Sequence, residues 1–117
     1  MKNILVADDS ETITTLLSTA LRSGGYQVTA ATDGSEAYQL GLSGEFDLAI
    51  LDQLMPGLLG PEIIDRWRAE GVETPVIMLT GIDDDRTAVD SLDKVGVDFM
   101  RKPFRINELL ARVRQRV

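Results

Sequence analysis

A short apolar run that ends in an aspartate constrains this chain more than any other feature. Residues 48–51 read Leu-Ala-Ile-Leu, Asp52 follows, and the chain turns at Met55-Pro56-Gly57. An uninterrupted apolar run of this length between turn residues is typical of a strand that is buried on both faces. Such a strand needs helices above and below it, and Asp52 would lie at the carboxyl edge of its sheet. Open α/β sheets bind their ligands at that edge.

The rest of the chain alternates short apolar runs with segments of helical periodicity. Further strands are predicted at residues 3–7, 27–31, 76–79 and 98–100, and helices are predicted to begin near Ser10, Asp33, Pro61, Asp83 and Ile106. Strict alternation of strands and helices implies a parallel sheet with right-handed crossovers. We therefore expect one α/β domain over residues 1–117. It would be a doubly wound (βα)5 three-layer sandwich with the flavodoxin-like strand order 2-1-3-4-5.

The composition excludes several classes of protein. The chain has 117 residues, of which 44% are hydrophobic, and it has no cysteine for a disulfide or a thiolate metal site. A net charge of −7 argues against a domain that itself grips a nucleic acid. No run reaches transmembrane length and the start does not resemble a signal peptide, so we expect a cytoplasmic protein without a membrane partner. Half of the twelve Lys and Arg residues lie from Arg101 onward. They could form a solvated helix face or a basic face on which a partner docks.

Five polar side chains follow the predicted strands at their carboxyl ends. Asp8 and Asp9 end the first strand, Asp52 the third and Thr80 the fourth, while Lys102 follows the fifth. Each alone has an ordinary interpretation as a cap or a turn residue, but together they would meet at one sheet edge. Three close carboxylates repel one another unless a cation neutralises them, and an oxygen-only site of this charge suits Mg²⁺. With the ammonium and the hydroxyl, this edge would form a cradle for a phosphoryl group.

Four segments of the sequence carry a resemblance to a known family. They are VADDS (6–10), LAILDQLMPG (48–57), VIMLTG (76–81) and FMRKPF (99–104). Together they resemble the receiver domain of bacterial two-component response regulators, over essentially the whole chain. The resemblance implies that a sensor histidine kinase donates a phosphoryl group from its phosphohistidine. This chain has no histidine, so the donor must be another molecule. The resemblance also implies a signalling domain that catalyses transfer onto itself and turns over no external substrate.

The resemblance assigns roles to the predicted site residues. Asp52 would be the phosphoacceptor and a ligand of Mg²⁺, Asp9 a direct metal ligand, and Asp8 a ligand that acts largely through water. The backbone carbonyl of Leu54 would complete the protein's metal ligands. Lys102 would pair with Asp52 and then with the phosphoryl group.

The resemblance further implies a switch between two states. Thr80 would hydrogen-bond a phosphoryl oxygen, and Phe99 would follow it into the vacated space. This movement would remodel the face made by the fourth helix, the fifth strand and the fifth helix, where a homodimer could form. The kinase would dock on the first helix near Ser10, Thr14 and Thr15. The output would be transcriptional regulation, through an attached output domain or a downstream target; an enzymatic output domain and a stand-alone receiver are the alternatives.

Departures from the family pattern and one peptide bond lead to further expectations. Val95 stands where a glycine is common, and Gly96 follows one residue later, so the sequence does not determine the conformation of the turn into the last strand. Arg105 replaces an aspartate that often caps the last helix, so that helix start should be weaker by roughly 1 kcal/mol. Leu54 and Ile82 are apolar at positions that flank the route of the hydrolytic water, so the phosphorylated aspartate should outlast that of fast chemotaxis-type receivers. The Lys102–Pro103 bond should be cis, as the resemblance implies.

Three rival functions share part of this pattern. A flavodoxin-type cofactor binder has the same topology, but its phosphate loop is rich in Ser, Thr and Gly, whereas this loop reads ADDSET and would repel a phosphate. A haloacid-dehalogenase-type phosphatase needs a second aspartate two residues after its nucleophile, where this chain has Leu54. A receiver-like module that binds a partner without phosphotransfer is the third alternative. The presence of Asp9, Asp52, Thr80 and Lys102 counts against it.

Overall fold

A five-stranded parallel sheet forms the centre of the molecule. The computed structural model describes residues 1–81 and 96–117. Its strands are β1 (Asn3–Ala7), β2 (Gln27–Ala31), β3 (Leu48–Asp52), β4 (Val76–Thr80) and β5 (Val97–Arg101). They lie in the order β2-β1-β3-β4-β5, and neighbouring strands are parallel. The predicted strand order is thus confirmed.

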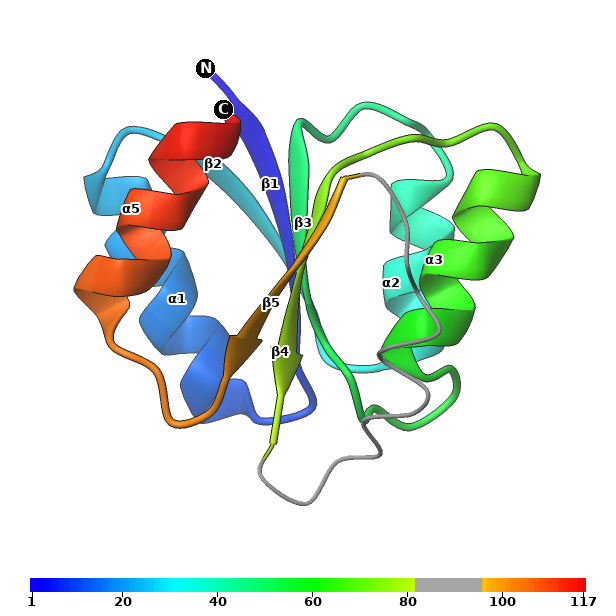
Figure 1. Cartoon of the computed structure of the whole chain (residues 1–117), viewed down its shortest axis with the longest axis horizontal. Helices are drawn as coiled ribbons and strands as arrows, with labels where there is room; N and C mark the ends of the chain where they lie inside the picture. Colours follow the sequence, from blue (N-terminus) through cyan, green and yellow to red (C-terminus); the bar gives the residue numbers. More distant parts are fainter. Residues whose placement is uncertain (82–95) are drawn as a thin grey trace.

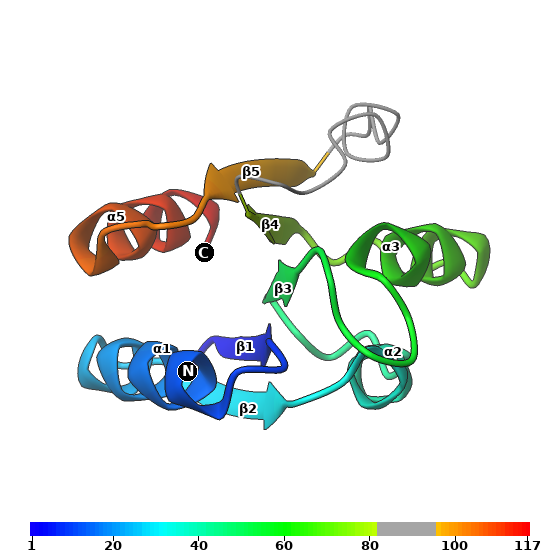
Figure 2. The ribbon, with the colours of Figure 1, turned by 90° about the horizontal axis from the view of Figure 1, so that it is seen from below.

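Helices cover both faces of this sheet and complete a three-layer α/β sandwich (Figure 1, Figure 2). One face carries α1 (Glu11–Ser23) and α5 (Ile106–Arg116), and the other carries α2 (Gly34–Gly41) and α3 (Gly60–Ala69). The predicted helix that begins near Asp83 lies outside the described residues. Within the described ranges, the helices are too short or too polar to cross a membrane.

The central strand β3 divides its side chains between two cores. All five of its residues are buried. Leu48 and Ile50 pack in the core beneath α1 and α5, whereas Ala49 and Leu51 pack in the core beneath α2 and α3. Because successive side chains point to opposite faces and both faces are covered, the sequence here is continuously apolar rather than alternating.

Side-chain caps define the starts of two helices and are missing from a third. Ser10 accepts a hydrogen bond from the backbone N–H of Ile13 at 3.3 Å at the start of α1. Asp33 accepts one from the backbone N–H of Glu36 at 2.7 Å at the start of α2. α5 follows Arg105 without a side-chain cap. The predicted caps of α1 and α2 and the uncapped start of α5 are confirmed.

The two ends of β5 also bear on the sequence predictions. The Lys102–Pro103 peptide bond after the strand is cis, as predicted. Gly96 precedes the strand with a φ of +88°, a conformation that favours glycine. Its carbonyl accepts a hydrogen bond from the backbone N–H of Val76 at 2.8 Å. Gly96 therefore forms the turn into β5, while Val95 lies outside the described residues.

Candidate functional site

The strand register brings the predicted site residues to one edge of the sheet. Asp8 follows the last residue of β1, which pairs with Leu51, so Asp8 lies at the level of Asp52. Thr80 ends β4, and its carbonyl accepts a hydrogen bond from the backbone N–H of Lys102 at 2.7 Å. In Figure 1 this edge is at the lower end of the sheet, where the strand arrows end.

Three carboxylates meet at this edge. One oxygen from each of Asp8, Asp9 and Asp52 lies within 4.8 Å of the other two. Asp8 and Asp52 are buried, with 1% and 5% of their surfaces exposed, whereas Asp9 is exposed. The Asp8 carboxylate accepts a hydrogen bond from the backbone N–H of Ser10 at 2.9 Å, which holds it in the turn before α1. The structure therefore gathers the three predicted metal-binding side chains.

Lys102 joins the two buried carboxylates. Its Nζ lies 3.0 Å from Asp8 Oδ2 and 3.3 Å from Asp52 Oδ1. The predicted pairing with Asp52 is present, but the shorter contact is with Asp8. Partial burial alone lowers the pKa of Lys102, but the hydrogen bond with Asp8 and the negative charges of both carboxylates outweigh it, so this pKa is raised.

Asp52 is held in an environment that disfavours its charged form. Burial, followed by the negative charge of Asp8, raises the pKa of Asp52 from 3.8 to about 6. The charge and the hydrogen bond of Lys102 act in the opposite direction and do not fully compensate. A second cation at this edge would favour the carboxylate form, which is the nucleophilic form of the side chain.

The donor set of this edge fits a hard divalent cation. Carboxylate oxygens are the ligands that Mg²⁺ prefers, and Mg²⁺ usually keeps several water molecules in its coordination shell. The exposed side chain of Asp9 leaves solvent access for such waters. Asp8, Asp9 and Asp52 could therefore hold a magnesium ion, which would relieve the repulsion between the carboxylates.

Thr80 and Phe99 are the predicted switch residues. Thr80 bonds to β5, and Phe99 is part of that strand. Thr80 Oγ1 donates a long hydrogen bond of 3.5 Å to the carbonyl of Met100. Phe99 is half-buried and packs against the core beneath α2 and α3. Its carbonyl accepts a hydrogen bond from Arg112 Nη1 at 2.8 Å. The Thr80 hydroxyl thus bonds to the β5 backbone rather than to the carboxylates.

The loop between β3 and α3 (residues 53–59, the β3–α3 loop) carries Leu54, the predicted carbonyl ligand. The Leu54 side chain is 47% exposed, and Leu59 in the same loop is 41% exposed. The loop contacts the N-terminus of α2, where the backbone N–H of Gly34 donates a hydrogen bond to the carbonyl of Pro56 at 2.8 Å. Sequence reasoning missed this contact, although Gly34 after the cap Asp33 and Gly57 after Pro56 were available signals.

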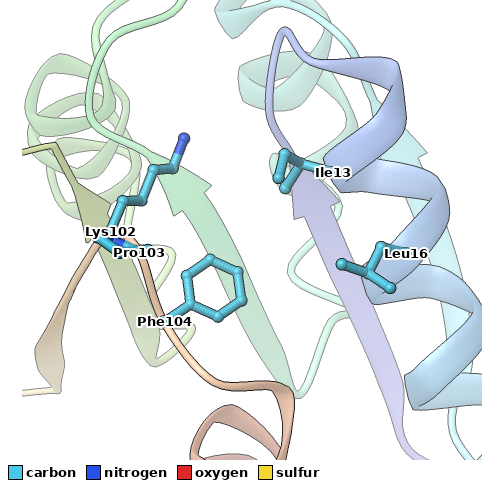
Figure 3. A pocket seen from close by; sticks show the side chains of 5 residues that line it. All are labelled: Ile13, Leu16, Lys102, Pro103 and Phe104. Carbon is cyan, nitrogen blue, oxygen red and sulfur yellow. The ribbon is translucent and has the colours of Figure 1, made fainter.

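An apolar groove lies beside Lys102. It has a volume of about 450 Å³ and is lined by Ile13 and Leu16 of α1 and by Lys102, Pro103 and Phe104 after β5 (Figure 3). In Figure 3 the ring of Phe104 faces the two α1 side chains across the groove. We name these five residues the α1–β5 groove. Sequence reasoning missed it because its two walls come from opposite ends of the chain.

The surface of α1 differs in one respect from the expected docking surface. Thr14 is buried, with 4% of its surface exposed, so it does not belong to an exposed face. Leu16 is 48% exposed instead. The buried stripe of α1 consists of Thr14, Leu17, Ser18 and Leu21, and Leu16 lies outside it.

Comparisons with known proteins agree with this geometry. Residues 4–114 match the model of the response regulator receiver domain family. The chain is 40% identical over 112 residues to YkoG of Bacillus subtilis (strain 168), an uncharacterized transcriptional regulatory protein, and this match covers 96% of the chain and 49% of YkoG. It is 40% identical over 113 residues to the alkaline phosphatase synthesis transcriptional regulatory protein PhoP of the same organism, covering 97% of the chain and 47% of PhoP. The chain thus spans about half the length of these curated relatives.

A solved structure gives the same result at the level of the fold. The receiver domain of the Francisella response regulator 1452 superimposes on this chain with a TM-score of 0.87 at 34% sequence identity. The match covers 98% of this chain and 95% of that chain. Receiver domains are signalling modules rather than enzymes that turn over an external substrate. The chain therefore belongs to the response regulator receiver domain family of two-component signalling systems.

Proposed function

We propose that Asp52 accepts a phosphoryl group from a sensor histidine kinase and that this event switches the output of the regulator. The observation that carries the proposal is the place of Asp52 at the centre of the carboxylate edge. It ends the central strand, whose buried residues fix its backbone, and it is itself buried. The ammonium group of Lys102 lies 3.3 Å from its carboxylate.

The transfer exchanges a P–N bond for a P–O bond. A carboxylate oxygen of ionised Asp52 attacks the phosphorus atom of a phosphohistidine on the kinase. The P–N bond breaks, the histidine nitrogen keeps the electron pair, and an acyl phosphate forms on Asp52. Asp9, Asp52 and the backbone carbonyl of Leu54, with Asp8 acting largely through water, would hold Mg²⁺, which would supply positive charge to the phosphoryl oxygens. Lys102 transfers its contact from the Asp52 carboxylate to a phosphoryl oxygen.

The α1–β5 groove is the surface on which we place the histidine-bearing part of the kinase. It lies beside Lys102, which contacts Asp52, so a helix seated there would present its histidine to the carboxylate. The apolar side chains of Ile13, Leu16 and Phe104 suit the apolar face of an amphipathic helix. The donor must be another molecule, because this chain has no histidine.

Phosphorylation of Asp52 changes the contacts between β5 and α5 through Thr80 and Phe99. Thr80 turns its hydroxyl toward a phosphoryl oxygen and gives up its 3.5 Å bond to the β5 backbone, and Phe99 moves into the space that it leaves. The backbone carbonyl of Phe99 is bonded to Arg112 of α5. A change at Phe99 therefore reaches α5 directly.

The exposed face of β5 and α5 is the surface on which we place a homodimer of the phosphorylated state. Asp98 of β5 pairs with Arg112 at 3.2 Å and with Arg116 at 3.3 Å within one chain. These charged groups could instead pair across a two-fold axis, which would exchange intramolecular for intermolecular bridges. The fourth helix, which was expected to contribute to this face, lies outside the described residues.

The names of the relatives support a transcriptional output. YkoG and PhoP are both named transcriptional regulatory proteins, and the chain matches about half of each. We therefore place residues 1–117 as one receiver domain of a cytoplasmic regulator, whose DNA contacts belong to an output domain or a downstream target. The net charge of −7 supports a receiver that does not itself bind nucleic acid.

The experiment that tests this proposal is intact-mass spectrometry after incubation with acetyl phosphate. We expect the chain to gain the mass of one phosphoryl group when Mg²⁺ is present, and we expect no gain with EDTA or in Asp52→Ala. Asp65→Ala is the matched control, an aspartate of α3 outside the carboxylate cluster, and it should be modified like the wild type. An unmodified wild type would favour the phosphorylation-independent docking module.

A further inference from the structure

The first residue of the β3–α3 loop is tied to the sheet and to α3. The backbone N–H of Gln53 donates a hydrogen bond to the carbonyl of Leu79 in β4 at 2.9 Å. The carbonyl of Gln53 accepts one from the backbone N–H of Gly60 at 2.9 Å. The chain just before Leu54 is therefore fixed on both sides.

The far side of Leu54 is fixed by the N-terminus of α2. The carbonyl of Pro56 accepts a hydrogen bond from the backbone N–H of Gly34 at 2.8 Å. Gly34 is buried, and the carbonyl of Leu58 lies directly against its Cα. Between these two anchors, only Leu54 and Met55 are left to set the direction of the Leu54 carbonyl.

Gly34 is required at this contact for space and not for its backbone conformation. Its φ is not in the positive region, where glycine is otherwise preferred. A Cβ built on Gly34 would lie 1.9 Å from the carbonyl oxygen of Leu58, far inside the 3.4 Å at which ordinary van der Waals contact begins. The atoms in the way are backbone atoms, so a rotation of a side chain cannot relieve the clash.

The opposite side of the same contact also lacks a side chain. A Cβ on Gly57 would lie 2.6 Å from Ser35 Oγ and 3.2 Å from the backbone nitrogen of Ser35. Gly57 also has a φ of +89°. The β3–α3 loop and the start of α2 are thus packed backbone against backbone.

We infer that Gly34 is a positioning residue for metal binding: it lets the loop approach α2 closely enough to direct the Leu54 carbonyl at the carboxylate cluster. This inference rests on the proposed function, in which that carbonyl is a ligand of Mg²⁺. Mg²⁺ demands near-ideal octahedral geometry with ligand distances of about 2.1 Å. A displaced loop therefore loses this ligand, while the three carboxylates, which lie at the end of β3 and in the turn after β1, stay in place.

The test is a titration of the metal-free chain with Mg²⁺ by isothermal calorimetry, beside urea unfolding of each variant. We expect Gly34→Ala to bind Mg²⁺ roughly 10-fold more weakly or worse, the range found when groups that support metal ligands are removed. Gly41→Ala is the matched control on the same helix. Its Cβ would lie 2.1 Å from the ring of Trp67, so it should destabilise the fold without changing the Kd for Mg²⁺.

A second variant decides the question if Gly34→Ala does not fold. Gly57→Ala presses on Ser35 from the exposed side of the contact, and the φ of +89° at this position disfavours a side chain, so it should displace the loop and weaken Mg²⁺ binding. An unchanged Kd in the variants that fold would overturn the inference.

The failure of the inference and the failure of the proposed function give different results. If the wild type binds no Mg²⁺, the proposed metal site itself is wrong. If the wild type and Gly41→Ala bind Mg²⁺ and Gly34→Ala binds it equally well, the carboxylate site stands and only the positioning role of Gly34 is lost.

Discussion

Asp52 carries the proposed chemistry, and its surroundings favour the protonated form when no metal is bound. Burial is the larger cause, and the neighbouring charge of Asp8 is the second. Lys102 offsets only part of this because it is shared between both carboxylates. Lys102 alone therefore does not neutralise the carboxylates of Asp8 and Asp52, and a divalent cation would stabilise their charged forms.

The raised pKa of Asp52 predicts how stability depends on pH without Mg²⁺. The folded chain holds the proton up to about pH 6, whereas the unfolded chain releases it near pH 3.8. This group therefore stabilises the fold below about pH 4, and the contribution is lost as the pH rises through 6, by at most about 3 kcal/mol. Urea unfolding of the wild type should weaken over this window relative to Asp52→Asn. A difference that is the same at pH 4 and pH 7 would contradict the assignment.

Leu54 belongs to the scale of single residues as well, because its side chain stands two residues after Asp52 and is 47% exposed. An apolar side chain here cannot orient a hydrolytic water, so we expect the acyl phosphate to persist for longer than seconds. Leu54→Asn should shorten its lifetime several-fold, measured as release of inorganic phosphate. Leu59→Asn, a similarly exposed leucine of the same loop, is the control. A wild-type lifetime of only seconds would rule out this role of Leu54.

The start of α5 is a weakness at the scale of a helix. Arg105 has the extended backbone of a cap, with φ −96° and ψ 136°, but its side chain cannot accept a hydrogen bond. We expect Arg105→Ser to raise the free energy of unfolding by roughly 1 kcal/mol, because the hydroxyl satisfies an unpaired backbone N–H. Arg105→Ala should leave stability nearly unchanged. Equal effects of the two substitutions would show that capping is not the cause.

The α1–β5 groove gives a second prediction at this scale. Leu16→Asp places a charge in the apolar groove and should slow phosphotransfer from a phosphorylated histidine kinase by 10-fold or more, at roughly 1.4 kcal/mol per factor of ten. Transfer from acetyl phosphate should be unchanged, because this small donor needs no docking surface. Leu59→Asp, outside the groove, is the control. An equal loss with both donors would place the effect in the chemistry rather than in docking.

The sequence was most informative where one local rule decides the structure. The run before Asp52 predicted a strand buried on both faces, and Ser10 and Asp33 predicted helix caps, because these features depend on neighbouring residues alone. The contact of Gly34 with Leu58 depends on how two loops approach in space. The glycines at positions 34 and 57 mark places where a backbone could approach closely, but no periodicity or spacing identifies the partner, so the contact had to come from the structure.

At the scale of the whole molecule, the strand order explains why distant segments share one site. β1 and β3 are neighbours although α1, β2 and α2 lie between them in the sequence, so Asp8 and Asp52 meet. Lys102 follows β5 and reaches both carboxylates across the sheet edge, with the shorter contact to Asp8. The sequence predicted which residues would gather here, but not how the lysine would divide its contacts.

The basic residues are concentrated toward the C-terminus, although the chain as a whole is acidic. Six of the twelve basic residues lie from Arg101 onward in a chain of net charge −7. Asp8, Asp9 and Asp52 are gathered at the carboxylate edge, where they would attract a cation. Of the six basic residues, Lys102 lies at that edge, whereas Arg112, Arg114 and Arg116 belong to α5, on which the proposed output contacts are placed.

The central claim is that Asp52 itself receives the phosphoryl group, and reductive trapping tests it most directly. The full chain is treated with Mg²⁺ and acetyl phosphate, reduced with borohydride, digested and mapped by mass spectrometry. An acyl phosphate on an aspartate is reduced to homoserine, and we predict this product at position 52 alone, and only when Mg²⁺ was present. Homoserine at position 8 or 9, or no homoserine in a chain that binds Mg²⁺, would contradict the account.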